Sequence, residues 1–143
     1  MDISYNAVSA YEAGGAYCEQ HNYTETKVFY GSFRSRSCSF NKRLNIYGDA
    51  IFYRSSVNFA YVYGSLVIRD HSKFESLKLY SNRAYINDSH IEHFNIMSTD
   101  QQPVVYVNSA AIDSLSFNGM PGIVYSDKQS KIGNLTNGEL RYV

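Results

Sequence analysis

The chain has no tryptophan, and only two prolines and two cysteines among its 143 residues. Two cysteines, Cys18 and Cys38, are too few for a disulfide framework or a zinc cluster. We therefore expect both to be reduced thiols with a structural role.

An excess of charge of one sign is also lacking, because 13 basic residues face 13 acidic ones. Nucleic-acid-binding surfaces are usually clustered and basic, so we expect no nucleic-acid partner. No window approaches the roughly 18 consecutive apolar residues of a membrane span. The N-terminal stretch has neither the basic start nor the apolar run of a secretory signal. These absences predict a cytoplasmic protein, or one that leaves the cell by a leaderless route.

Tyrosine, by contrast, is abundant at 14 residues, and asparagine and serine are frequent. Together with the low proline content, this composition suits short strands joined by tight polar turns better than a helical bundle. A chain of 143 residues corresponds to one domain.

The sequence repeats with a period near 17 residues. A small residue follows an alternating apolar triplet at intervals of 17, 16, 17, 17 and 21 residues, at Gly31, Gly48, Gly64, Ser81, Ser98 and Gly119. A second column lies nine residues earlier and reads Ser39, Ser55, Ser72, Ser89 and Ala110, followed by Ser130. Apolar residues come two positions after it, at Val57, Phe74, Ile91, Ile112 and Ile132, and three further on, at Ala60, Leu77, Phe94, Leu115 and Leu135.

A short period with several apolar positions, each flanked by polar neighbours, is typical of a β-solenoid. One coil cannot bury its inward residues alone, so stacked coils bury them against neighbouring rungs about 4.8 Å away. Helical repeats need units of about 33 to 45 residues and are excluded by the period. The sequence therefore predicts an all-β, single-stranded parallel β-helix of about six coils. The general preference for right-handed crossovers favours a right-handed solenoid.

The repeat assigns residues 27–143 to the solenoid, whereas residues 1–26 do not match it. We expect the latter to form a cap over the strand edges of the first coil. Short insertions at 98–103 and 119–122 should bulge from one corner. The recurring serines should bond local backbone groups and form a ladder with the next rung.

Two outward columns are rich in large side chains. One precedes the small corner residue and reads Tyr30, Tyr47, Tyr63, Tyr80 and Met97; the other follows the corner and reads Ile51, Val67, Tyr85, Tyr106 and Tyr125. Stacked tyrosines would stabilise the register of the coils by roughly 0.2 to 1 kcal/mol per pair. Alternatively, these columns form an interaction face for self-association, a partner protein or a glycan.

An enzymatic alternative rests on Glu75, Glu92 and Asp113, which would lie on neighbouring rungs as a row of carboxylates. Like charges about 5 Å apart could prepare a general acid, but a solvated charged face balanced by the adjacent basic column of Lys73, His90 and Lys131 is the favoured explanation. A convex face without roofing loops should hold no pocket. His90 and His93 could chelate a metal on a helix but diverge on a coil, so we predict no catalytic residues and no metal site.

The stretch VYGSLVIRDHSKFESLKLYSNRAYINDSHIEHFNIMS, with its coil of about 17 residues and small corner residues, resembles the polymer-forming solenoids called bactofilins. The resemblance covers residues 27–138. It implies a right-handed parallel β-helix that stacks end to end into filaments, without a cofactor and without catalysis.

The first functional hypothesis is therefore a scaffold that self-associates through coil edges or through the tyrosine columns. A second is a binding module, such as a secreted bacterial effector or surface component, that grips a host protein or glycan with the same tyrosines. A weaker third is a polysaccharide hydrolase or lyase using the carboxylate row.

Overall fold

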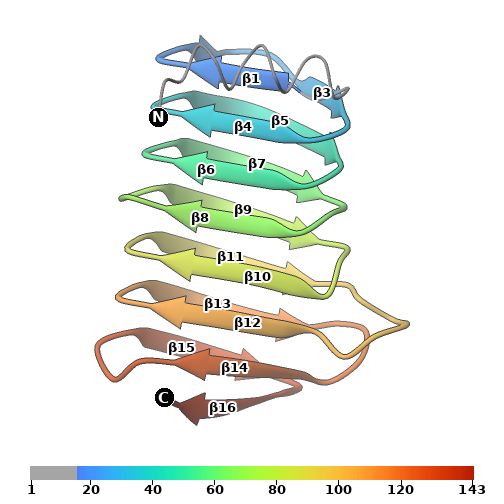
Figure 1. The fold of residues 1–143 in the computed structure, drawn as a ribbon, viewed down its shortest axis with the longest axis vertical. Helices are drawn as coiled ribbons and strands as arrows, with labels where there is room; N and C mark the ends of the chain where they lie inside the picture. Colours follow the sequence, from blue (N-terminus) through green and yellow to red (C-terminus); the bar gives the residue numbers. More distant parts are fainter. Residues whose placement is uncertain (1–15) are drawn as a thin grey trace.

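The computed structural model describes residues 16–143, which wind into a parallel β-solenoid (Figure 1). Its strands are β1 (Ala16–Glu19), β2 (Asn22–Tyr23), β3 (Lys27–Tyr30), β4 (Phe33–Arg36), β5 (Ser39–Tyr47), β6 (Ala50–Tyr53), β7 (Ser56–Val62), β8 (Leu66–Arg69), β9 (Lys73–Leu79), β10 (Arg83–Asn87), β11 (His90–Ile96), β12 (Val104–Asn108), β13 (Ala111–Phe117), β14 (Gly122–Ser126), β15 (Lys131–Thr136) and β16 (Gly138–Tyr142). The predicted fold class is confirmed. Followed from the N-terminal end, the chain winds clockwise away from the viewer, so the solenoid is right-handed (Figure 1).

The strands form two sheets that face each other across the core. One sheet has the order β1-β4-β6-β8-β10-β12-β14-β16, and the other has the order β15-β13-β11-β9-β7-β5-β2, with β3 also paired to β5. Every strand thus pairs with the strand one coil away, as a stacked solenoid requires.

The register of the stack matches the apolar columns read from the sequence. Ile91 pairs with Phe74 on one side and with Ile112 on the other. Phe94 likewise lies between Leu77 and Leu115. Side chains at these positions are at most 1% exposed, so each column is an inward row.

Phenylalanine rings connect the two sheets inside the N-terminal half of the core. The ring of Phe52, on β6, lies 5.9 Å from that of Phe33 and stands edge-on to Phe74 of β9 at 4.9 Å. Phe33 in turn contacts Phe40 of β5 edge-on at 5.9 Å. Edge-to-face geometry of this kind adds roughly 0.5 to 1.5 kcal/mol per pair beyond the burial of apolar area.

The stacked strands begin earlier than the repeat suggested. β1 pairs with β4 and β2 pairs with β5, although both lie within the predicted cap of residues 1–26. With eight strands in one sheet, the solenoid has about seven turns rather than six. Residues 1–15 of the predicted cap lie outside the described part of the chain.

Ser39 is one residue out of its predicted column. The structure pairs Ser39 with Ser56, and the backbone N–H of Cys38 donates to the hydroxyl of Ser55. The cause is a register shift within β5, a β-bulge that adds a residue to this strand. The residue nine positions before Gly48 is therefore Ser39, whereas the structure places Cys38 in the serine column.

The insertion before β12 bulges from one corner of the solenoid, as predicted (Figure 1). Within residues 16–143, the structure forms no helix long and apolar enough to cross a membrane.

Candidate functional site

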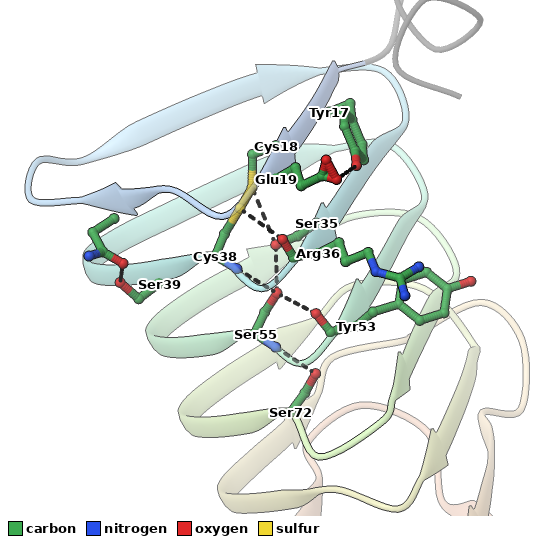
Figure 2. Close-up of a disulfide and its surroundings, with 11 residues drawn as sticks. Tyr17, Cys18, Glu19, Ser35, Arg36, Cys38, Ser39, Tyr53, Ser55 and Ser72 are labelled. Carbon is green, nitrogen blue, oxygen red and sulfur yellow. Dashed lines mark hydrogen bonds between the residues drawn. A yellow bond between two sulfur atoms is a disulfide. The ribbon is translucent and has the colours of Figure 1, made fainter. Parts of the chain in front are cut away.

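Three buried serines form a hydrogen-bonded column at one corner of the solenoid, which we call the serine ladder: Ser55, Ser72 and Ser89. The backbone N–H of Ser55 donates to the hydroxyl of Ser72, and that of Ser72 to the hydroxyl of Ser89, both at 3.0 Å. Each hydroxyl donates in turn to a backbone carbonyl of its own coil, at 2.9 to 3.0 Å. Figure 2 shows the end of the ladder formed by Ser55 and Ser72. Since buried polar groups need such partners, the structural interpretation of the serines is confirmed.

We predict that Ser72→Ala lowers the free energy of unfolding by about 1 to 3 kcal/mol, because the buried N–H of Ser55 loses its acceptor. Urea denaturation followed by circular dichroism measures this change. Ser76→Ala is the matched control, because Ser76 lies half-buried on the outer side of β9, the strand that follows Ser72, and should shift stability by less than about 0.5 kcal/mol. Equal losses in the two variants would contradict the role of the ladder.

The structure joins Cys18 and Cys38 in a disulfide, so the expectation of two reduced thiols is wrong. Both side chains are buried, and the bond ties β1 to the turn that precedes β5 (Figure 2). The hydroxyl of Ser35 lies 3.4 Å from the Cys18 sulfur and 2.7 Å from the hydroxyl of Ser55. The disulfide thus continues the polar column at the N-terminal end of the serine ladder.

Four tyrosines stack on successive rungs and form the first tyrosine ladder: Tyr30, Tyr47, Tyr63 and Tyr80. Neighbouring ring centroids lie 5.3, 4.6 and 4.4 Å apart, with interplanar angles of 6° to 19°. Burial and the neighbouring rings of Tyr80 and Tyr47 raise the pKa of the Tyr63 hydroxyl. Met97 continues the column on the next rung and is half-buried.

Three further tyrosines, Tyr85, Tyr106 and Tyr125, form the second tyrosine ladder on the opposite sheet. Their centroids are 4.9 and 5.5 Å apart, with interplanar angles of 5° and 18°. Ile51 and Val67 precede them in the same column. Arg141 follows on β16, and its guanidinium donates to the Tyr125 hydroxyl at 3.4 Å.

Stacking decides which part of each tyrosine is available to another molecule. Within a ladder, each inner ring has both faces covered by its neighbours, so only ring edges and hydroxyls point outward. The edge of an aromatic ring carries partial positive charge, whereas its face is negative. The ladders therefore present hydroxyls and weakly positive edges rather than flat aromatic plates.

A groove of about 790 Å³ runs beside the second tyrosine ladder. Its other residues include Val67, Arg69, Asn87, Asn108 and Asp127, which project from the same sheet or from the turns after its strands. The hydroxyl of Ser130 and backbone N–H groups donate to Asp127, and they lower the pKa of its carboxyl group. This groove combines an apolar wall with several polar groups, as binding sites do.

The strand register places Glu75, Glu92 and Asp113 at the same position on β9, β11 and β13, so the carboxylates form a row on neighbouring rungs. Asp113 lies 2.9 Å from His90, while Glu75 is exposed and Glu92 is half-buried. An open groove of about 580 Å³ lies at the corner of the solenoid that precedes the row. Its lining includes the basic column of Lys73, His90 and Lys131, together with His71, and none of the three carboxylates.

His90 and His93 do not converge. His90 turns to Asp113, whereas His93 lies in register with Ser76 and Ser114 on the neighbouring strands. Among residues 16–143, no group of three side chains is arranged to hold a metal ion.

The groove's polar residues were not predicted, although the sequence contains a signal for them. The triplets YIN, YVN and YSD at 85–87, 106–108 and 125–127 each place Asn or Asp two residues after a ladder tyrosine. Residues two apart on a strand share one face, so each rung presents both side chains to solvent together.

Comparison of the chain with known protein families, with curated proteins and with solved structures finds no match in any of the three. Strand pairing alone therefore defines its class, and the chain is a β-solenoid protein.

Proposed function

We propose that this chain is a non-enzymatic structural protein that self-associates through the end of its solenoid formed by β15 and β16. One observation carries the proposal. Among residues 16–143, β16 pairs with β14 on one side and with no strand on the other. The inward side chains of this coil, Ile132, Leu135 and Leu140, are only half-buried. An unpaired strand edge beside incompletely covered apolar groups is a template for a second chain.

The backbone of β16 offers its hydrogen bonds to that edge at alternate residues. The N–H of Val143 donates to the carbonyl of Ser126, so the backbone N–H and C=O of Val143 point toward β14. Backbone groups of successive strand residues point to opposite sides. The groups that face the open edge therefore belong to Gly138, Leu140 and Tyr142.

Two copies of β16, paired antiparallel about Leu140, are complementary to each other. The two Leu140 residues would exchange backbone hydrogen bonds and pack their inward side chains together. Glu139 would lie opposite Arg141 of the second copy, at the position where cross-strand side chains approach most closely. Tyr142 would cover Gly138 of the second copy, an aromatic–glycine pair that stabilises sheet edges.

The charges also select this register. Sliding one strand by two residues places either Glu139 against its own copy or Arg141 against its own copy. Like charges directly opposite each other are destabilising, so the pairing about Leu140 is favoured over its neighbours. The product is a dimer with two-fold symmetry, the commonest arrangement of identical chains. The architectural resemblance to bactofilins supports the same kind of end-to-end contact.

We predict that charge reversal at this edge weakens the dimer and that a double reversal restores it. Glu139→Arg or Arg141→Glu alone would create two like-charged pairs across the interface and weaken association about tenfold or more. The combined variant re-forms both opposite-charge pairs. Analytical ultracentrifugation over about 1 to 500 µM measures each dissociation constant. A particle that stays monomeric at every concentration would refute the proposal.

A second pair of variants separates contact at the end from contact along the side. Leu140→Lys places a charge among the inward groups of β16 and should abolish the dimer. Tyr63→Ser removes a ring from the first tyrosine ladder, far from the edge, and should leave the dissociation constant unchanged. The reverse result would assign self-association to the ladder.

The disulfide bears on where the protein works. The sequence predicted the cytoplasm or leaderless export, but disulfides persist mainly in oxidising compartments. The buried bond between Cys18 and Cys38 therefore supports a site of action outside the reducing cytosol. Thiol labelling of the protein taken directly from its native source tests this, since a fully labelled protein would place it in a reducing compartment.

A further inference from the structure

The groove beside the second tyrosine ladder runs along the side of the solenoid and reaches Val143, the residue after β16. Its volume of about 790 Å³ is within the range of roughly 300 to 1,000 Å³ typical of ligand sites. Three rungs contribute to it in the same way, each with one tyrosine as the wall. Its composition and its periodicity together define what it could bind.

The same pair of side chains recurs along the groove. Tyr106 lies in register with Tyr85, and Asn108 lies in register with Asn87. The next rung continues the wall with Tyr125. A ligand lying along the groove therefore meets an aromatic edge with its hydroxyl, and a polar side chain, once every rung of about 4.8 Å.

The amides in this row are available for a ligand. Within residues 16–143, the side chains of Asn87 and Asn108 make no hydrogen bond, and Arg69 at one end of the groove forms no ion pair. Each amide offers two donors and an acceptor, and each tyrosine hydroxyl can donate and accept. Such groups match a ligand that carries hydroxyls along its length.

The charges in the groove argue against a polyanion. Arg69 supplies a positive charge toward one end and Asp127 a negative charge toward the other. Binding of nucleic acid requires several basic groups along the phosphate backbone, which this groove does not provide. A neutral chain suits it better.

The spacing separates a glycan from a peptide. An extended peptide advances about 3.3 Å per residue and falls out of step with rungs about 4.8 Å apart. Each sugar of an extended β-linked chain advances by close to one rung, so one sugar can lie at each rung, with alternate sugars turned to opposite sides. From these observations we infer that the groove binds a neutral, linear, β-linked glycan, with one sugar at each of the rungs of Tyr85, Tyr106 and Tyr125.

Calorimetric titration of the full chain with β-1,4-linked glucose oligomers of about two to six units tests this inference. Affinity should rise with length until the three rungs are filled and then level off. Asn108→Ala should weaken binding about three- to tenfold through lost hydrogen bonds. Tyr106→Phe keeps the ring stack and should weaken binding through the hydroxyl alone.

Tyr63→Phe is the matched control, because it removes the same hydroxyl from the first tyrosine ladder and should leave affinity unchanged. The inference fails if no oligomer binds at about 10 mM, if affinity does not depend on length, or if Asn108→Ala binds as tightly as the unmodified chain. Competition by extended peptides without any binding of oligosaccharide would also overturn it. Sedimentation of the same variants keeps the two proposals apart, since loss of glycan binding need not alter the dimer.

Discussion

Replacing Phe74 by alanine should lower the free energy of unfolding by about 3 to 5 kcal/mol. The Phe74 side chain has no exposed surface and lies between Val57 and Ile91 in its column. Its ring also meets Phe52 of the opposite sheet at 4.9 Å. Removing the ring opens a cavity that borders two rungs and both sheets. The surrounding side chains are held in place and have little freedom to fill it. Chemical denaturation monitored by circular dichroism measures the loss.

The matched control is Lys73→Ala, one residue earlier on the same strand. Lys73 is exposed, so this change should alter stability by less than about 0.5 kcal/mol. A loss below about 1 kcal/mol for Phe74→Ala would mean that the inward rows are not tightly packed. The solenoid register would then need another explanation.

The double change Cys18→Ser and Cys38→Ser should cost about 2 to 5 kcal/mol. The disulfide closes a loop with a sequence separation of 20 and holds β1 against the first complete coils. Serine is close in size to cysteine, and the sulfur of Cys18 already lies beside the hydroxyl of Ser35. Most of the effect should therefore come from the lost crosslink rather than from poor packing.

Reductant provides the internal control for this prediction. Reducing the natural chain should lower its midpoint of denaturation toward that of the double variant, whereas the variant itself should not respond. Proteolysis should also reach residues 16–26 sooner in the variant, because strands at the end of a stack open most easily. A natural chain that is equally stable with and without reductant would show that the bond does not contribute.

Periodicity made the fold predictable because each inward column repeats the same physical requirement on every coil. The pairing of Phe74, Ile91 and Ile112 follows from the sequence because no coil can bury these side chains alone. The period gave no information where it was interrupted. Because of the bulge in β5, the repeat assigns Ser39 rather than Cys38 to the serine column. Cys18 precedes the first recognisable repeat. The pairing of the two cysteines therefore could not be predicted.

The candidate site was predicted in part. The sequence placed the tyrosines in two outward columns, and the structure stacks Tyr47 on Tyr63 and Tyr85 on Tyr106. It did not reveal that stacking would leave only the edges of the inner rings exposed, since ring orientation depends on packing between rungs. The groove could not be predicted from the sequence either. Its polar residues lie beside the tyrosines only because the stacked strands share one outward face.

The serine ladder has a consequence for how such a protein can change in length. Each corner donates its backbone N–H to the serine hydroxyl of the coil that follows, so the segment from Ser72 up to Ser89 contains everything needed to satisfy its neighbours. Tandem duplication of that segment would lengthen the rod by about 4.8 Å without altering either terminus. The length of the solenoid can therefore change in fixed increments of one coil.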